Sequence, residues 1–275
     1  MMKRIATIQD FSCVGRCSLS VALPIISAAG IECCGVPTAA LSNHTGFSTY
    51  YNRDLTDDLH NFGSKFSELG ITFDAIYTGY IASIEQMDFV EDFINRFGRD
   101  GAPVFVDPVM GDNGRLYSQI TADYAQKIRR LCARADVITP NLTEAFLLLG
   151  EDYRESLSDP DICEMLKKLA DTGAGAVVIT GISKGSQIGC SAYDGAGFHH
   201  VFTEKQDLFC MGTGDIFSSA MLAALVREKP FPRALDIAVR FTEEAVKKTA
   251  ADPDRRFYGV NFEQAIPLLI RLMEE

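Results

Sequence analysis

The fold of this chain is decided by the stretch Phe209-Cys210-Met211-Gly212-Thr213-Gly214-Asp215-Ile216-Phe217. A short apolar run leads into Gly-Thr-Gly-Asp, and the helical spacing that follows predicts a helix to about Arg227. Two glycines let the backbone turn tightly, so that several N–H groups can point the same way. The helix behind them begins with unpaired N–H groups and a partial positive charge. This arrangement predicts a pocket for an anion, most naturally a phosphate.

Asp215 falls in the first turn of that helix, beside the predicted pocket. A carboxylate in this place can take a proton from a hydroxyl group as that hydroxyl attacks a phosphoryl group, so Asp215 is a candidate general base. The alternative is that Asp215 only complements the helix dipole and that the glycines only form a loop. A short glycine-rich match does not decide between these two interpretations, so the rest of the chain must.

Composition narrows the class of protein. The 275 residues carry a net charge of −11, with 47% hydrophobic and 23% charged residues. These fractions are ordinary for a globular protein, and the acidic balance argues against a general binder of nucleic acid or anionic membranes. We find neither a membrane-length apolar run nor a signal-peptide pattern, so we expect a cytoplasmic protein without nucleic-acid or membrane partners. The eight cysteines form no Cys-x-x-Cys pair, which indicates reduced thiols.

Strand and helix patterns alternate along the chain. Strands are predicted at residues 4–9, 31–36, 75–78, 104–106, 137–138 and 176–179, with a hairpin at 187–193 and 197–202. Helices are predicted at residues 18–28, 54–69, 84–97, 121–133, 143–149, 161–171, 232–249 and 261–273, besides the one after Gly-Thr-Gly-Asp. Alternation of this kind predicts an α/β fold with a mostly parallel sheet, helices on both faces and an antiparallel edge hairpin. We expect one domain spanning residues 1–275, with Ser18 as a helix N-cap and Pro37 closing the second strand.

Five predicted strands end in polar residues. These ends are Asp10, 78–80, Asp107, 139–141 and Thr180. In open parallel sheets ligands bind beyond the carboxyl ends of the strands. Agreement among five ends therefore predicts a binding site at that edge of the sheet.

Two carboxylates at this edge are candidates for a metal site. Phosphoryl transfer needs Mg²⁺, which proteins usually hold with one or two carboxylates plus substrate and water. Asp107, just off a strand, and Glu144, at the start of the helix that Asn141 opens, can supply them directly or through water. Glu144 is also placed to be the capping-box partner of Asn141, and the two roles can coexist.

Further polar residues are candidates for ligand contacts. Thr45 can bind a polar group on a substrate ring, and Tyr80 can stack on a flat ligand or instead belong to the core. Lys184 can neutralise phosphate or be an ordinary surface lysine. His44 is more typical of a structural histidine than of a catalytic base.

Common nucleotide motifs are missing. The chain has no Gly-x-x-x-x-Gly-Lys-Ser/Thr and no Gly-x-Gly-x-x-Gly after the first strand. This argues against a P-loop ATPase and a standard dinucleotide dehydrogenase.

Four motifs together resemble one family. Their order along the chain is Ser42-Asn43-His44-Thr45, Asp107-Pro108-Val109-Met110-Gly111-Asp112, Thr139-Pro140-Asn141 with Glu144, and Gly212-Thr213-Gly214-Asp215. In these residues the chain resembles the pyridoxal kinases of the ribokinase-like superfamily, over residues 5–250. Gly-Thr-Gly-Asp alone marks only the superfamily. The Ser-Asn-His-Thr run combined with the Asp-Pro-Val-Met-Gly block is much more specific to the vitamin B6 kinases.

The resemblance implies a ribokinase-like three-layer sandwich and an enzyme that uses ATP and Mg²⁺ to phosphorylate the hydroxymethyl group of B6 vitamers. It leaves dependence on a monovalent cation such as K⁺ open, and it implies a homodimer. Asp215 is then the general base, and the N–H groups from Gly212 to Asp215, through Thr213 and Gly214, form the anion hole. The resemblance also places Thr45 and Tyr80 at the pyridine ring and Asp107 and Glu144 near the metal. It places Asp112 and Tyr117 near the phosphates, and Asn141 and Thr180 on the nucleotide side. We expect residues 111–117 to form a mobile lid.

One residue departs from the family pattern. Many pyridoxal kinases have Gln-Ser after the first strand, with the serine touching the substrate, whereas this chain has Gln9-Asp10. A carboxylate in place of a hydroxyl prefers a cationic ring substituent, so our hypothesis is that Asp10 favours pyridoxamine over pyridoxal.

Other functions share parts of this pattern. The nearest alternative is a hydroxymethylpyrimidine kinase of thiamine synthesis, which also phosphorylates a flat heteroaromatic alcohol. A ligand-binding protein that kept the fold is a non-enzyme alternative, but the intact Asp215 and glycines argue against it. The Ser-Asn-His-Thr run argues against a sugar kinase.

Overall fold

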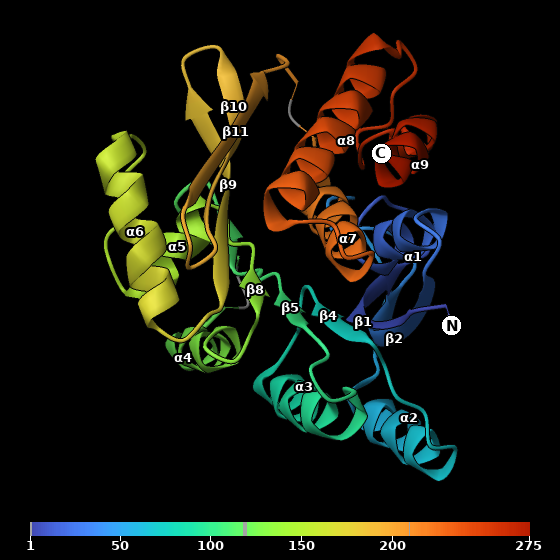
Figure 1. Cartoon of the computed structure of the whole chain (residues 1–275). Helices are drawn as coiled ribbons and strands as arrows, with labels where there is room; N and C mark the ends of the chain where they lie inside the picture. Colours follow the sequence, from blue (N-terminus) through green and yellow to red (C-terminus); the bar gives the residue numbers. More distant parts are fainter. Residues whose placement is uncertain (1, 118–119, 209) are drawn as a thin grey trace.

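A large central sheet organises the computed structural model, which describes residues 2–117, 120–208 and 210–275 (Figure 1). In the described residues this sheet has nine strands in the order β11-β10-β9-β8-β5-β4-β1-β2-β3. Neighbours from β9 to β2 pair in parallel, whereas β10 and β11 form an antiparallel hairpin at one edge and β3 pairs antiparallel at the other. The strands are β1 (Arg4–Ser12), β2 (Glu32–Leu41), β3 (Asn52–Asp54), β4 (Ala75–Thr78), β5 (Val104–Val106), β8 (Val137–Ile138), β9 (Ala176–Lys184), β10 (Gln187–Tyr193) and β11 (Phe198–Glu204).

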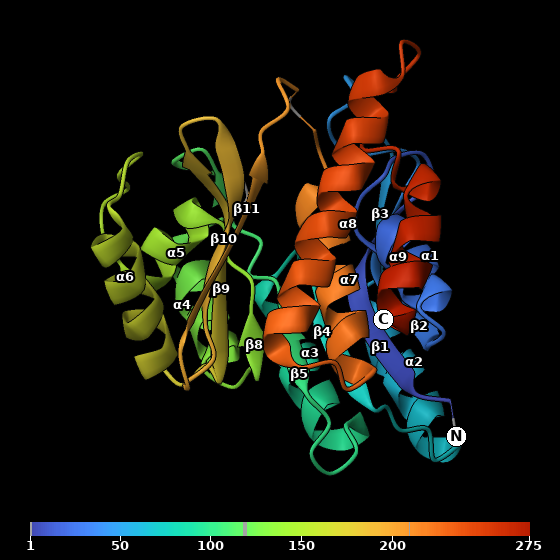
Figure 2. The same cartoon turned by 45° about the horizontal axis from the view of Figure 1, so that its top comes forward.

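Helices cover both faces of the sheet (Figures 1 and 2). One face packs against α1 (Leu19–Ala28), α7 (Thr213–Val226), α8 (Phe231–Ala251) and α9 (Ile266–Glu274), with the short 3₁₀ helix η1 (Phe262–Gln264) before α9. The other face packs against α2 (Thr56–Glu68), α3 (Ile84–Phe97), α4 (Ala122–Cys132), α5 (Leu142–Leu149) and α6 (Asp159–Asp171). Strand side chains alternate between two apolar cores, because successive residues of a strand point to opposite faces. The expected three-layer α/β sandwich is therefore confirmed.

The sequence explains how these helices are placed. Residues 216–224 of α7 are all buried, because this helix is apolar on every side and lies between the sheet, α1 and α8. In contrast, α3 buries the stripe of Phe89, Phe93 and Phe97, and the Ser83 side chain caps its start by accepting a bond from the N–H of Gln86. None of the helices in the described ranges combines the length and the apolar character that crossing a membrane requires.

Several predicted boundaries were wrong. Strand β2 continues through Pro37 to Leu41, because Pro37 lies opposite Gln9 at an irregularity in the β1–β2 register, where a residue without an N–H is tolerated. Strand β9 runs past Thr180 to Lys184, since pairing with β10 extends it. The short edge strand β3 was not predicted. Phe209, the first residue of the predicted apolar run, lies outside the described residues.

The predicted lid segment contains a small hairpin. Strands β6 (Gly111–Asp112) and β7 (Arg115–Leu116) pair antiparallel. Asn113 and Gly114 turn between them with φ of 51° and 73°. The Gly114 N–H donates to Oγ1 of Thr143 at 2.9 Å, which holds the turn against α5. Closure of this hairpin over a ligand stays a prediction.

Candidate active site

The N-terminus of α7 has the geometry predicted for an anion site. Gly212 is the N-cap, with φ of 80°, and its carbonyl accepts the first helical bond from Ile216 N at 3.1 Å. Within the described part of the chain, no acceptor is found for the N–H groups of residues 213–215. These groups and the helix dipole favour a bound anion. A Cβ on Gly212 would lie 2.2 Å from the carbonyl oxygen of Arg16, so only glycine fits there.

Asp215 lies in the first turn of α7, as predicted, and its residue is only partly exposed. Its Oδ2 accepts a hydrogen bond from the backbone N–H of Ser18 at 2.9 Å. Burial raises the pKa of Asp215 to about 7, and the nearby charge of Asp10 acts in the same direction. A carboxyl group with this pKa is suited to exchange a proton near neutral pH.

Asp107 and Glu144 contribute two further carboxylates to the region around the start of α7. A Cβ on Gly214 would lie 3.9 Å from Oδ2 of Asp107, so this carboxylate borders the anion site. Burial, with the charges of Glu144 and Asp215, raises the pKa of Asp107 well above its usual range, and Oγ of Ser218 donates to its Oδ2 at 3.3 Å. The three acids therefore share one electrostatic environment.

Glu144 is the capping-box partner of Asn141, which is one of the two roles predicted for it from the sequence. Its carboxylate completes a capping box with Asn141, and its Oε1 also accepts from Met110 N at 3.0 Å. Burial raises the pKa of Glu144, while these backbone bonds oppose the rise. Because both oxygens already accept N–H bonds, Glu144 is better placed to reach a metal through water than directly.

The described residues contain no group of three His, Cys, Asp or Glu side chains that could hold a metal by themselves. Mg²⁺ does not need such a cage, since it commonly binds one or two carboxylates together with phosphates and water. Asp107 fits this pattern because it is a buried carboxylate beside an anion site.

The candidate substrate residues cluster around Asp10. Asp10 is buried in β1, and its Oδ1 accepts from Oγ of Ser18 at 2.6 Å. Burial raises the pKa of Asp10, and burial together with the charge of Asp10 raises the pKa of Tyr80. Burial lowers the pKa of His44, whose Nδ1 accepts from Gly46 N at 2.9 Å. The fold therefore brings together residues from β1, from the 42–46 loop and from the end of β4.

Thr45 is exposed on the 42–46 loop. This loop lies against the approach to α7, because a Cβ on Gly46 would be 3.2 Å from Sδ of Met211. Thr45 precedes Gly46 directly, so it lies near the glycine turn in space, and its contact with a substrate stays a prediction.

The residues expected on the nucleotide side also gather at the strand ends. Asn141 and Thr180 form an isolated parallel bridge, and Nδ2 of Asn141 donates to the carbonyl of Gly111 at 2.8 Å. Burial and the carboxylates of Glu144 and Asp112 raise the pKa of Tyr117 to about 12. Both oxygens of Asp112 accept bonds from Asn113, which fixes its orientation on the small hairpin.

Lys184 has partners that the sequence did not indicate. It forms an ion pair with Asp159 at the start of α6, and its ammonium lies 4.5 Å from the ring centroid of Phe202. These contacts join β9 to α6 and the hairpin. A role for Lys184 toward ATP stays a prediction.

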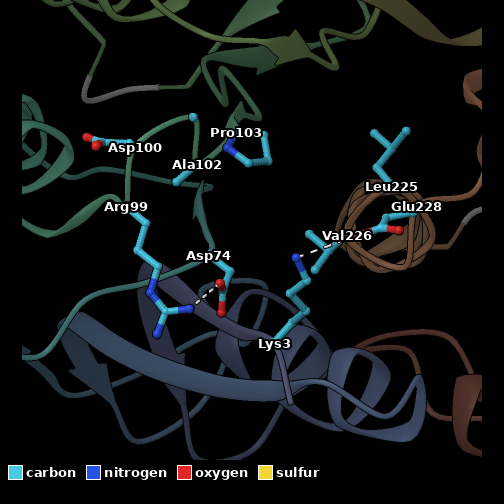
Figure 3. A pocket seen from close by; sticks show the side chains of 10 residues that line it. Lys3, Asp74, Arg99, Asp100, Ala102, Pro103, Leu225, Val226 and Glu228 are labelled. Carbon is cyan, nitrogen blue, oxygen red and sulfur yellow. Dashed lines mark hydrogen bonds and ion pairs between the residues drawn. The ribbon is translucent and has the colours of Figure 1, made fainter. Parts of the chain in front are cut away.

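A separate hollow lies at the opposite end of the sheet (Figure 3). Its lining includes Lys3, Asp74 and Pro103, which precede β1, β4 and β5 respectively. Arg99 pairs with Asp74, and Lys3 lies 3.8 Å from Glu228, so its charges are largely balanced within the protein. Ligands of open parallel sheets bind beyond the carboxyl ends of the strands, which excludes this hollow as the main site.

Two serines of the site were missed. Ser218 bonds Asp107 and lies 3.0 Å from Oγ1 of Thr139, and Ser18 bonds both Asp10 and Asp215. Ser218 is a polar residue three positions after Asp215 in an otherwise apolar helix. Because residues i and i+3 lie on the same helix face, this spacing could have indicated that Ser218 faces the site. Ser18 had no such signal and was predicted only as a cap.

The helix start of α7 has the geometry of an anion site and lies beside a candidate base and a buried carboxylate. In this sandwich, that arrangement is typical of the small-molecule kinases of the ribokinase-like superfamily. The chain belongs to the phosphomethylpyrimidine kinase family, whose family model matches residues 26–260.

Similar proteins agree with this class. The chain is 27% identical to a pyridoxal kinase of Arabidopsis thaliana over 276 residues, which cover 93% of this chain and 85% of that protein. A crystal structure of pyridoxal kinase from Lactobacillus plantarum has a TM-score of 0.92 and 29% identity, covering 100% of this chain and 99% of that one. A Bacteroides thetaiotaomicron protein named as a candidate phosphomethylpyrimidine kinase, crystallised with pyridoxal, has a TM-score of 0.93 and 36% identity, covering 98% and 96% of the two chains.

Proposed function

We propose that this protein transfers the γ-phosphoryl group of ATP to the 5′-hydroxymethyl group of the B6 vitamers pyridoxal, pyridoxamine and pyridoxine. The observation that carries the proposal is the position of Asp215, at the start of α7 between the unpaired N–H groups and the cluster around Asp10. The similarity to pyridoxal kinases and to a protein crystallised with pyridoxal supports the same substrate class.

The reaction needs mainly positioning and stabilisation of charge. Asp215 accepts the proton as the hydroxyl oxygen forms its bond to the γ-phosphorus, and the bond from that phosphorus to the β-phosphate oxygen breaks to release ADP. The N–H groups of residues 213–215 stabilise the negative charge on the transferred group. Asp107, with Glu144 through water, would hold Mg²⁺, which neutralises phosphate charge when bound. Thr45, Tyr80 and Asp10 would contact the pyridine ring.

The direct test is an assay of the purified protein with ATP and each vitamer. We expect ADP and the 5′-phosphate of the vitamer to form in equal amounts and to depend on added Mg²⁺. Absence of ATP-dependent product with all three vitamers would reject the proposal and favour a ligand-binding protein.

A hydroxymethylpyrimidine kinase is the second candidate, because the matching family is described as phosphomethylpyrimidine kinase. Turnover of hydroxymethylpyrimidine beside pyridoxal and pyridoxamine separates the two. A higher kcat/KM for the pyrimidine than for every vitamer would assign this second function.

Three further expectations complete the proposal. The chain forms one domain over residues 1–275, because both cores run along the same sheet. It acts as a homodimer in the cytoplasm, where its free cysteines stay reduced. The requirement for K⁺ is tested by replacing it with Na⁺ in the assay.

We predict an acid limb in the pH profile of kcat. Asp215 must be ionised to accept a proton, and its pKa is about 7, so kcat should fall tenfold per pH unit below about pH 7 and level off above it. The measurement is kcat with saturating ATP and pyridoxal from pH 5.5 to 9. Two other nearby groups have shifted pKa values, since burial lowers the pKa of His44 and raises that of Glu144 to about 8. The limb near pH 7 should therefore persist in His44→Asn. A flat profile would contradict the role of Asp215.

We predict that Asp10 sets the preference among vitamers. The protonated aminomethyl group of pyridoxamine would meet the Asp10 carboxylate, whereas pyridoxal has no cation there. In Asp10→Ser the ratio of kcat/KM for pyridoxamine to that for pyridoxal should fall roughly tenfold, the usual effect of one hydrogen bond to a charged group. Steady-state kinetics of the two vitamers measures it, and an unchanged ratio would end the idea.

A further inference from the structure

Ser18 uses all of its polar groups at the junction of β1, α1 and α7. Its N–H donates to Oδ2 of Asp215 at 2.9 Å, and its Oγ donates to Oδ1 of Asp10 at 2.6 Å. Its carbonyl accepts the first bonds of α1, from Val21 N and Ala22 N. Ser18 is only 6% exposed, so these bonds are shielded from water. One residue therefore connects two carboxylates that are 205 positions apart in the chain, at 10 and 215.

The backbone of Ser18 is not that of an ordinary helix cap. An N-cap serine usually has an extended backbone and accepts a bond from an N–H of the first turn. Ser18 has φ of 48° and ψ of −130°, and its side chain makes no capping bond. A non-glycine residue rarely has positive φ, and such residues persist where surrounding contacts fix them, often at functional sites. This conformation directs the N–H toward α7 and the hydroxyl toward β1.

The two bonds determine how Asp215 faces the site. Ser18 N–H holds Oδ2, which leaves Oδ1 for the hydroxyl of a substrate. Asp10 and Asp215 repel each other when both are ionised, because each carries a negative charge in a shielded region. Donors from a single residue to both carboxylates offset this repulsion and fix their separation.

We propose that Ser18 is a positioning residue that ties the candidate base Asp215 to the substrate-side carboxylate Asp10. The inference rests on the proposed function, in which these two groups contact the same vitamer. Its hydroxyl orients Asp10 for binding of the ring, and its strained backbone places the N–H that orients Asp215 for proton transfer. The two effects separate in kinetics, because the first acts on substrate binding and the second on kcat.

The hydroxyl is tested with Ser18→Ala and Ser18→Gly, which both keep the N–H. The dissociation constant of pyridoxal is measured by calorimetry without ATP, so no turnover is involved. We expect it to rise roughly tenfold in both variants, while kcat at saturating pyridoxal stays within about threefold of the wild-type value. In the Asp10→Ala background, adding Ser18→Ala should change the dissociation constant no further, since its partner is gone.

The backbone is tested with Ser18→Val. A β-branched residue does not adopt this positive φ, so the N–H should turn away from Asp215 and kcat should fall roughly 10- to 100-fold. Thermal unfolding shows whether each variant is folded. If Ser18→Val does not fold, the Ala, Gly and double-mutant measurements still decide the proposal.

The matched control is Ser20→Ala. Oγ of Ser20 donates to the carbonyl of Ser12 at 2.7 Å, so this change also removes a serine bond between α1 and β1 but touches neither carboxylate. It should leave the dissociation constant and kcat unchanged. A change equal to that of Ser18→Ala, or full additivity of Ser18→Ala with Asp10→Ala, would overturn the proposal. If the wild-type protein itself neither binds pyridoxal nor turns it over, the proposed function fails, and this inference fails with it.

Discussion

Replacing Asp215 with asparagine is expected to lower kcat roughly 10²- to 10⁴-fold, the usual range for a positioned general base. The amide oxygen can still accept the bond from Ser18 N–H, so the start of α7 should keep its geometry. The amide cannot accept the substrate's proton at neutral pH, so only the chemical step suffers. Asp215→Ala should lose a similar factor. The measurement is kcat with saturating ATP and pyridoxal, together with thermal unfolding.

The control for this experiment is Asp123→Asn. Asp123 is also an acid in the first turn of a helix, α4, but its residue is exposed. Its loss should weaken only a favourable interaction with the helix dipole and leave kcat unchanged. If Asp215→Asn behaves like Asp123→Asn, with near wild-type turnover, Asp215 is merely a helix-start acid and is not the base.

The second large effect is expected for Gly212→Ala. A Cβ at this position would lie 2.2 Å from the carbonyl oxygen of Arg16, whose own N–H is bonded to Tyr258 O, so the turn must move. Movement of the turn displaces the N–H groups that would stabilise the transferred phosphoryl group. Loss of one such donor typically lowers kcat roughly 10²- to 10³-fold. The same assay measures it, with kcat as the deciding value.

Gly30→Ala separates the effect of the turn from the general cost of a positive φ. Gly30 has φ of 81°, against 80° for Gly212, but a Cβ there meets no atom within 4 Å. Both variants should lose stability, by about 1 kcal/mol or more, because alanine is strained at positive φ. Only Gly212→Ala should lose turnover. Equal kcat in the two variants would show that the glycine turn does not contribute to catalysis.

Much of the fold could be predicted because its signals are local. The helical pattern of residues 84–97 predicted α3 with its observed bounds, and the sequence after Gly212 predicted α7 to within a residue. Pro37 and the end of β9 show the limit of local signals. Whether a proline interrupts a strand, or a strand continues past a glycine, depends on which neighbour pairs with it, and that neighbour is distant in the chain.

The sequence by itself determined the class of fold, and it predicted an anion-binding turn and the edge of the sheet for the candidate site. These follow from hydrophobic periodicity, from two glycines before a helix and from the rule that parallel strands end together. Only the tertiary structure decided which atoms meet: that Ser18 bonds both Asp10 and Asp215, that Ser218 bonds Asp107, and that Lys184 pairs with Asp159. Such contacts depend on how the helix layers pack on the sheet and on single side-chain and backbone angles, which residue spacing along the chain does not encode.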